Sequence, residues 1–260
     1  VGAAAINPGP RAQITAALGR AARACGYTGG FSVIISAENG EELARQTYNE
    51  HLGVVGGLSI LGTSGIVEPM SEKALVDTIL LELDSLYAGG QRTAFLCPGN
   101  YGADFARDTL GLDLEKAVKC SNFIGEALDH AVFRGFRDIL LVGHAGKLVK
   151  LAAGVMNTHS SVADGRQEIF TAHAALCGAG RDTLEGLMQS ISVDACIELL
   201  DRENLREPVL ARIESEIEKR LALRLRGRGH VEFILFTAKY GILAQSPGAM
   251  ALCERLRESK

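Results

Sequence analysis

The sequence predicts an α/β protein with two parts, an incomplete N-terminal α+β domain over residues 1–88 and an α/β domain over residues 89–260. In the second part, short apolar strands alternate with amphipathic helices, which is typical of a parallel sheet flanked by helices. The first part offers only a hairpin, one further short strand and two helices, and the composition shifts at Gly89-Gly90. With 260 residues, of which 47% are hydrophobic, the chain can bury a sizeable core.

The elements of the first part follow from local signals. Apolar residues at three- and four-residue steps predict a helix over 11–25. Asn39-Gly40, flanked by β-branched and polar residues, predicts a strand pair over 31–37 and 42–48. A short apolar run follows over 58–61, and Ser71 then caps a predicted helix that ends near Tyr87.

The second part predicts three strands, over 93–97, 138–142 and 231–236. The segments between and after them show helical periodicity. The predicted helices lie near 103–109, 121–135, 147–154, 168–178, 181–189, 192–203 and 207–226, and from about 247 to the end. The apolar stripe of 207–226 is too short for a coiled coil and predicts a helix that covers the sheet.

Composition excludes several classes of protein. A formal charge of -4 argues against a broad nucleic-acid-binding surface, so no nucleic acid partner is expected. The six cysteines form no Cys-x-x-Cys pair, which predicts reduced thiols and no metal site. No apolar run approaches the length of a membrane span, and the start of the chain lacks the features of a signal peptide. We therefore expect a cytoplasmic protein with no membrane partner.

Three Gly-x-x-Gly turns lead from apolar segments into predicted helices, at 62–65, 99–102 and 143–146. Such turns in a parallel sheet lie at the carboxyl ends of the strands, where ligands bind. Together with the segment 237–241 after the last strand, they predict a ligand-binding rim. For any single turn, the alternative that the glycines only allow close packing is equally favoured.

Familiar nucleotide and hydrolase motifs are absent from the sequence. The segment 143–148 is too short for a phosphate-binding loop and has Leu148 at the magnesium-binding position. Ser64 does not lie in a G-x-S-x-G elbow, and no G-x-G-x-x-G fingerprint of dinucleotide binding occurs.

The densest polar cluster follows the predicted helix 147–154. Its members are Asn157, Thr158, His159, Ser160, Asp164 and Arg166. Capping of a loop explains part of this set, and the concentration of charged and imidazole groups indicates a binding site. His144 stands separately at a strand end, where a neutral imidazole can act as a base or a hydrogen-bond donor.

These residues resemble the CbiD methyltransferases of anaerobic cobalamin biosynthesis. The resemblance runs in order over most of residues 5–164 and is weaker beyond about 170. The matching segments are Ala5-Ile-Asn-Pro8, Leu58 to Ser71, Pro98-Gly-Asn-Tyr-Gly102, Ser121-Asn-Phe-Ile-Gly125, Val142 to Gly154, Asn157-Thr-His-Ser160 and Ala163-Asp164.

The resemblance implies transfer of a methyl group from S-adenosylmethionine to carbon 1 of cobalt-precorrin-5B, which gives cobalt-precorrin-6A. It also implies an α+β domain followed by an α/β domain. Family members carry a further α+β stretch upstream of the Ile-Asn-Pro segment. We therefore expect a missing N-terminal segment and an exposed sheet edge, with dimerisation or retention of a cleaved piece as the consequence.

Roles can be assigned to the residues on this basis. The glycine turns are expected to hold the cofactor, and the polar cluster the tetrapyrrole with its many carboxylates. Expected cofactor contacts are Gly99, Asn100, Gly102, Gly143 and Gly146. Expected substrate contacts are Lys147, Asn157, His159, Ser160 and Arg166, with Lys150 as a further candidate. His144 and Asp164 are expected to handle a proton or to orient the reacting groups.

Two alternatives belong to other classes. One is a phosphate- or nucleotide-binding transferase built on Gly143 to Lys147. The other is a tetrapyrrole-binding fragment without catalytic activity.

Overall fold

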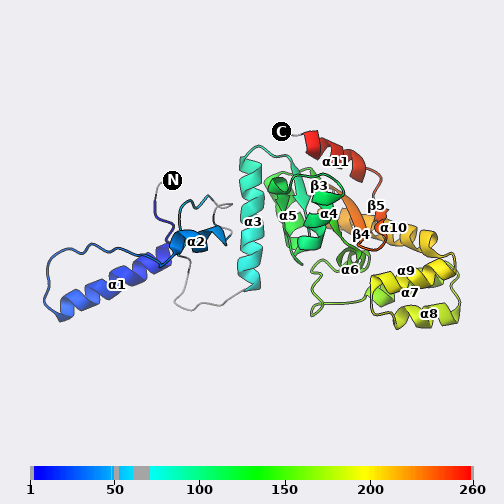
Figure 1. The fold of residues 1–260 in the computed structure, drawn as a ribbon, viewed down its shortest axis with the longest axis horizontal. Coiled ribbons are helices and arrows are strands. Elements are labelled where there is room, and N and C mark those ends of the chain that lie inside the picture. Colours follow the sequence, from blue (N-terminus) through cyan, green and yellow to red (C-terminus); the bar gives the residue numbers. More distant parts are fainter. Residues whose placement is uncertain (1–2, 48, 50–52, 61, 63–70, 259–260) are drawn as a thin grey trace. The chain divides into compact units, whose positions relative to one another are not determined.

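The computed structural model describes residues 3–47, 49, 53–60, 62 and 71–258. The chain divides into two compact units, Val1–Glu72 and Lys73–Lys260. The division lies earlier than the predicted boundary at 88/89, because the helix before that boundary packs into the second unit. Figure 1 shows the elements of both units in sequence colours. In the described part of the chain, no helix is both long and apolar enough to cross a membrane.

The first unit contains the helices α1 (Pro8–Ala24) and α2 (Gly40–Arg45). The predicted helix over 11–25 is confirmed, and it begins earlier because prolines stabilise the first turn, where their missing N–H is not needed. Ile6 and Ile60 form an isolated parallel bridge, which is all that the structure shows of the strand predicted over 58–61 in its described residues.

The predicted hairpin over 31–37 and 42–48 is wrong. Asn39 adopts a left-handed conformation with φ of 53°, but Gly40 begins helix α2 rather than supplying the second left-handed residue of a hairpin turn. Glu41 and Glu42 then occupy the first helical turn, where negative charge favours the helix dipole. Local helix preference therefore prevails over the turn signal.

The second unit contains a five-stranded sheet in the order β2-β1-β3-β4-β5. The three predicted strands are confirmed as β1 (Thr93–Leu96), β3 (Asp138–His144) and β4 (His230–Thr237). They pair in parallel, and the two-residue strand β2 (Ala117–Val118) adds to β1 in the same direction. The last strand, β5 (Gly241–Gln245), is antiparallel to β4 and was not predicted.

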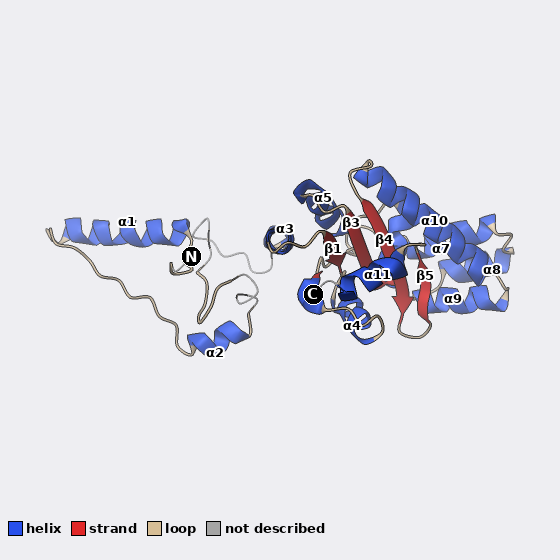
Figure 2. Ribbon diagram, turned by 90° about the horizontal axis from the view of Figure 1, so that it is seen from above, coloured by secondary structure: helices blue, strands red, loops and turns tan. Residues whose placement is uncertain are grey.

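Helices cover both faces of this sheet, as Figure 2 shows. The helices of the unit are α3 (Glu72–Ala88), α4 (Asn100–Asp108), α5 (Ile124–Arg134), α6 (Ala145–Leu148), α7 (Arg166–Leu176), α8 (Arg181–Met188), α9 (Val193–Arg202), α10 (Arg206–Leu225) and α11 (Ala249–Glu258), with short 3-10 turns at Leu114–Lys116 and Val149–Ala153. The predicted α/β class with a parallel sheet flanked by helices is confirmed.

The strands carry apolar side chains on both faces, because each face has its own core. On one face, Leu96, Leu141 and Phe233 pack with residues of α3, α5, α10 and the segment after β3. On the other face, Phe95 and Val142 pack with residues of α4 and α11. Strands β1, β3 and β4 are therefore largely buried between two helical layers, so that the ends of these strands are the natural place for a ligand.

Candidate functional site

The site lies where two neighbouring strands send their connections to opposite faces of the sheet. Strand β1 leads into α4, whose buried residues belong to one core, and the adjacent β3 leads into α6, whose Leu148 belongs to the other core. In open α/β sheets, such a switch point leaves a crevice outside the carboxyl ends of the strands. Gly99 and His144 stand at these two ends.

The four predicted glycines at this edge divide into two kinds. A Cβ on Gly102 would lie 2.7 Å from the carbonyl oxygen of Val142, and one on Gly143 would lie 2.9 Å from Cγ of Leu148. Gly102 and Gly143 are therefore needed for close packing of α4 and α6 against β3, whatever else they do. The alternative of close packing thus accounts for these two glycines.

Gly99 and Gly146 lie instead beside polar side chains. Gly99 has φ of 93° and ψ of -179°, a conformation that is essentially restricted to glycine, and a Cβ there would lie 3.4 Å from Nζ of Lys147. A Cβ on Gly146 would lie 3.1 Å from Nδ1 of His144 and 3.8 Å from Nη1 of Arg166. The structure thus brings Gly99, His144, Gly146, Lys147 and Arg166 together at one edge.

His144 is the N-cap of α6, and its hydrogen bonding defines its tautomer. Its Nδ1 accepts a hydrogen bond from the backbone N–H of Gly146 at 3.1 Å, so in the neutral ring the proton is on Nε2. Burial lowers the pKa of His144, and the nearby Arg166 charge lowers it further, while the charge of Asp194 raises it. A neutral ring with Nε2–H available is suited to donating a hydrogen bond.

Lys147 reaches across the site to the loop before α5. Its Nζ donates to the carbonyl oxygen of Ser121 at 3.2 Å, and partial burial lowers the pKa of the ammonium group. On the other side of the β1 turn, Asn100 is exposed and its Oδ1 accepts from Nζ of Lys119 at 3.4 Å. Both predicted residues therefore lie at the carboxyl edge of β1.

Asp164 and Arg166 form a two-pronged ion pair. Nε and Nη2 of Arg166 donate to the two carboxylate oxygens at 2.6 and 2.8 Å. The hydrogen bonds from Arg166 hold the pKa of Asp164 below its usual value. Asp164 is thus an ionised group that orients Arg166, and this arrangement supports the orienting role predicted for it more than proton transfer.

Lys150 is a structural residue rather than a free cation. It is 3% exposed, and its Nζ donates to the carbonyl oxygens of Thr158 at 3.1 Å and Ala163 at 2.9 Å, with Asp164 at 3.7 Å. These bonds hold the two ends of the loop 158–163 together. The candidate role of Lys150 toward substrate carboxylates is therefore not supported.

The remaining members of the polar cluster lie on this loop and partly bond to one another. Asn157 forms an isolated antiparallel bridge with Phe123, and its Oδ1 accepts from the N–H of His159 at 3.1 Å. Nδ1 of the exposed His159 lies 2.6 Å from Oγ of Ser161, and Ser160 is exposed. Loop capping therefore explains part of the cluster, while His159 and Ser160 remain accessible.

Two residues near the edge had no predicted role. Tyr101, in the first turn of α4, is 78% exposed, and its ring centroid lies 6.2 Å from that of His144. His144 in turn contacts the ring of Phe236 edge-on at 5.7 Å. Asp194, in the first turn of α9, lies close enough to His144 to affect its pKa. Tyr101 belongs to a quoted motif, but the sequence around Asp194 signals only a helix start.

The other predicted turns differ from the expected rim. The turn 237–241 lies at the carboxyl end of β4 but leads into the antiparallel strand β5 rather than into a helix. Lys239 in this turn forms an ion pair with Glu198 of α9. In the turn 62–65, residues 63–65 lie outside the described residues.

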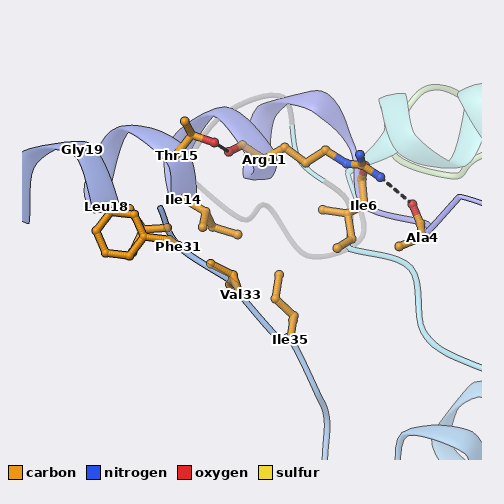
Figure 3. Close-up of a pocket in the computed structure, with 10 residues that line it drawn as sticks. All are labelled: Ala4, Ile6, Arg11, Ile14, Thr15, Leu18, Gly19, Phe31, Val33 and Ile35. Carbon is orange, nitrogen blue, oxygen red and sulfur yellow. Dashed lines mark hydrogen bonds between the residues drawn. The ribbon is translucent and has the colours of Figure 1, made fainter. Parts of the chain in front are cut away.

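The first unit carries a separate apolar groove, shown in Figure 3, with a volume of about 690 Å³. Phe31, Val33 and Ile35 of an extended segment face Ile14 and Leu18 of α1 across it. Arg11, the one charged residue among the described residues that line it, donates to backbone carbonyls of Ala4 and Ile6. Among the described residues, no acidic side chain and no histidine lines the groove. In the described part of the chain, no cluster of three or more His, Cys, Asp or Glu residues has the arrangement of a metal site.

Comparison with known proteins identifies relatives along nearly the whole chain. The relative from Ruminiclostridium cellulolyticum is 51% identical over 91% of this chain and 62% of its own length. Relatives from Photorhabdus laumondii and Alkaliphilus metalliredigens are 42% and 38% identical, each over 99% of this chain and over 68% and 67% of their own lengths. All three carry the name cobalt-precorrin-5B C(1)-methyltransferase.

The chain thus spans about two thirds of the length of these relatives. No solved structure is significantly similar to it. The family model CbiD matches residues 1–69, and the model of the CbiD C-terminal domain matches residues 157–247. These matches, together with the identity to the curated relatives, establish that the chain belongs to the CbiD family.

Proposed function

We propose that this chain takes part in transferring a methyl group from S-adenosylmethionine to carbon 1 of cobalt-precorrin-5B, which gives cobalt-precorrin-6A. Its relatives' names support the substrate and the carbon that is methylated. The observation that carries the proposal is the convergence of Gly99, His144, Gly146, Lys147 and Arg166 at the switch point between β1 and β3.

The residues present are suited to the methyl donor. Gly99 leaves the backbone without a Cβ at the carboxyl end of β1, and Gly146 does the same beside His144 and Arg166. Lys147 lies beside Gly99, and His144 and the Arg166–Asp164 pair lie beside Gly146. S-adenosylmethionine, when bound at these glycines, would supply the methyl group from its sulfonium. The carbon–sulfur bond breaks, and the sulfur leaves as a neutral thioether that keeps the electron pair.

The chain's own contribution is orientation. Displacement at a methyl carbon requires the nucleophile and the leaving sulfur in line, so that holding both partners lowers the barrier by reducing the entropy lost in the transition state. The neutral ring of His144 carries an Nε2–H that can donate to a ligand, and Asp164 orients the guanidinium of Arg166 through two hydrogen bonds. Tyr101 adds an exposed aromatic face beside His144.

The tetrapyrrole is expected to lie on the side of Lys147, Asn157, His159 and Ser160. Lys147 offers an ammonium group at the edge of the crevice, and His159 and Ser160 lie exposed on the loop held by Lys150. A substrate with several carboxylates requires such donors at separated points. Arg166 lies beside the turn at Gly146, where its Nη1 is 3.8 Å from the position of a Cβ on that glycine.

Calorimetry tests the proposal directly. The chain is titrated separately with S-adenosylhomocysteine, with ATP and magnesium, and with a corrin that carries carboxylates. Binding of S-adenosylhomocysteine and of the corrin supports methyl transfer. Binding of the corrin alone would instead identify a tetrapyrrole-binding fragment without catalytic activity, and magnesium-dependent binding of ATP alone would identify a nucleotide-binding transferase.

A further inference from the structure

The amino end of α7 is hydrogen-bonded to the segment that precedes α9, and a charged residue from the first turn of each helix acts on His144. Arg166 is the first residue of α7, and Gln167 next to it donates from Nε2 to the carbonyl oxygen of Ser190 at 2.7 Å. Ser190 directly precedes the segment in which Ser192 caps α9 through the N–H of Ala195. This link places Asp194, the second residue of α9, in the same region as Arg166.

Arg166 and Asp194 differ in how far their hydrogen-bonding groups are paired. Arg166 uses Nε and Nη2 for Asp164, and its Nη1 lies 3.8 Å from the position where a Cβ of Gly146 would stand. Oδ1 of Asp194 is buried and has no hydrogen-bond partner within the described residues. A buried carboxylate oxygen without a partner is costly and requires an explanation.

A helix-capping role does not provide that explanation. An acidic residue in the first turn of a helix is stabilising because of the helix dipole, and this effect is achieved with the side chain exposed to solvent. Asp182 occupies the equivalent second position of α8 and is exposed. Asp194 is instead partly buried, with a charge that acts on His144.

We propose that Asp194 and Arg166 form a binding site for an α-amino-acid group, with the ammonium on the carboxylate of Asp194 and the carboxylate on Nη1 of Arg166. Nε2–H of His144 supplies a further donor for the ligand carboxylate. An α-amino acid carries one charge of each sign on a single carbon, which matches an aspartate and an arginine that both lie near one histidine.

This inference rests on the proposed function, because the methyl donor S-adenosylmethionine carries such an α-amino-acid group. It assigns Arg166 to the donor rather than to the tetrapyrrole. The amino-acid end would then be anchored by α7 and α9 near Gly146, and the adenosine part would be left to the turn at Gly99.

The test compares two ligands that differ in the amino-acid group. S-adenosylhomocysteine carries it, whereas 5′-methylthioadenosine retains the adenosine and the thioether without it. Dissociation constants are measured by calorimetry for the wild-type chain, for Asp194→Asn and for Asp182→Asn. The last variant removes the same charge from the same helical position at an exposed site.

Asp194→Asn should weaken binding of S-adenosylhomocysteine at least tenfold and change that of methylthioadenosine less than twofold. Asp182→Asn should change neither. Equal weakening of both ligands, or no effect on either, would overturn the inference and leave the proposed function intact. If the wild-type chain binds neither ligand, the proposed cofactor is wrong and the inference fails with it.

One comparison needs no variant and so does not depend on how Asp194→Asn folds. An analogue of S-adenosylhomocysteine that lacks only the α-amino group should bind the wild-type chain at least tenfold more weakly. Equal affinity for the two compounds would show that no carboxylate receives the ammonium group, and would overturn the role of Asp194.

Discussion

Replacing Lys150 with methionine separates its structural role from any role in binding. Methionine retains a long apolar side chain and removes the ammonium group that bonds to the carbonyl oxygens of Thr158 and Ala163. These carbonyls lie at the two ends of the loop that carries His159 and Ser160. Lys150→Met should therefore destabilise the unit and loosen this loop together.

The loss of unfolding free energy follows from two lost hydrogen bonds, offset by an ammonium group that no longer has to be buried. Leaving a buried polar group unpaired costs about 1–3 kcal/mol, so the two carbonyls cost about 2–6 kcal/mol. Relief from burying the ammonium of Lys150 offsets part of this, and we expect a net loss of about 3 kcal/mol. For a unit of this size, that loss lowers Tm by about 6–12 °C.

Thermal unfolding followed by circular dichroism measures this effect, with Lys147→Met as the control. Lys147 is half-buried and, within the described residues, its side chain makes one hydrogen bond, to the carbonyl oxygen of Ser121, so its replacement should cost only about 1 kcal/mol. If Lys150→Met lowered Tm by no more than Lys147→Met does, the assignment of Lys150 as a structural residue would be refuted.

Three further substitutions probe the crevice. Gly99→Ala should cost about 1–3 kcal/mol of stability and weaken binding of S-adenosylhomocysteine more than tenfold. The control Gly178→Ala, also at positive φ but in open space, should lower stability without changing the affinity. Equal affinities of the two variants for S-adenosylhomocysteine would contradict this prediction. Asp164→Asn should lower methyl transfer about tenfold in a single-turnover assay, a loss of about 1.4 kcal/mol, because Arg166 loses its orienting partner, and unchanged turnover would argue against that role. Burial lowers the pKa of His144 in the folded state, so the unfolded chain binds more protons as the pH falls below about 6.5, and the free energy of unfolding should decrease on acidification. Denaturant unfolding at pH 7.5 and 5.5 should show a smaller decrease for His144→Gln than for the wild-type chain. An equal decrease in the two proteins would refute the lowered pKa of His144.

The strands and helices of the second unit could be predicted because each has a strong local signal. A strand buried on both faces is a continuous apolar run, as in Ile139 to Val142, and a helix over a core has a periodic stripe, as in α10. Strand β5 was missed because it begins directly after a turn and its residues are only partly buried. The hairpin was wrong because the Asn39-Gly40 signal is also compatible with a helix start.

The site was predictable only as a location. The glycine turns indicate the carboxyl edge of the sheet, but the sequence does not distinguish Gly102, which packs on Val142, from Gly99, which faces Lys147. That distinction depends on neighbours brought together by the fold. The same holds for Lys150, whose partners lie 8 and 13 residues away, and for Asp194, whose charge acts on His144 from a distant part of the sequence.

The central claim, that the ligand site lies at the carboxyl ends of β1 and β3, is tested most directly by tryptophan fluorescence. The chain has no tryptophan, so Tyr101→Trp introduces a single reporter beside His144 at a position that is 78% exposed. Phe133→Trp places the same reporter on α5 at a position that is 77% exposed. On titration with S-adenosylhomocysteine, the emission of the Tyr101→Trp variant should change saturably while that of the Phe133→Trp variant stays constant. Calorimetric binding that leaves the emission of the Tyr101→Trp variant unchanged would contradict the account.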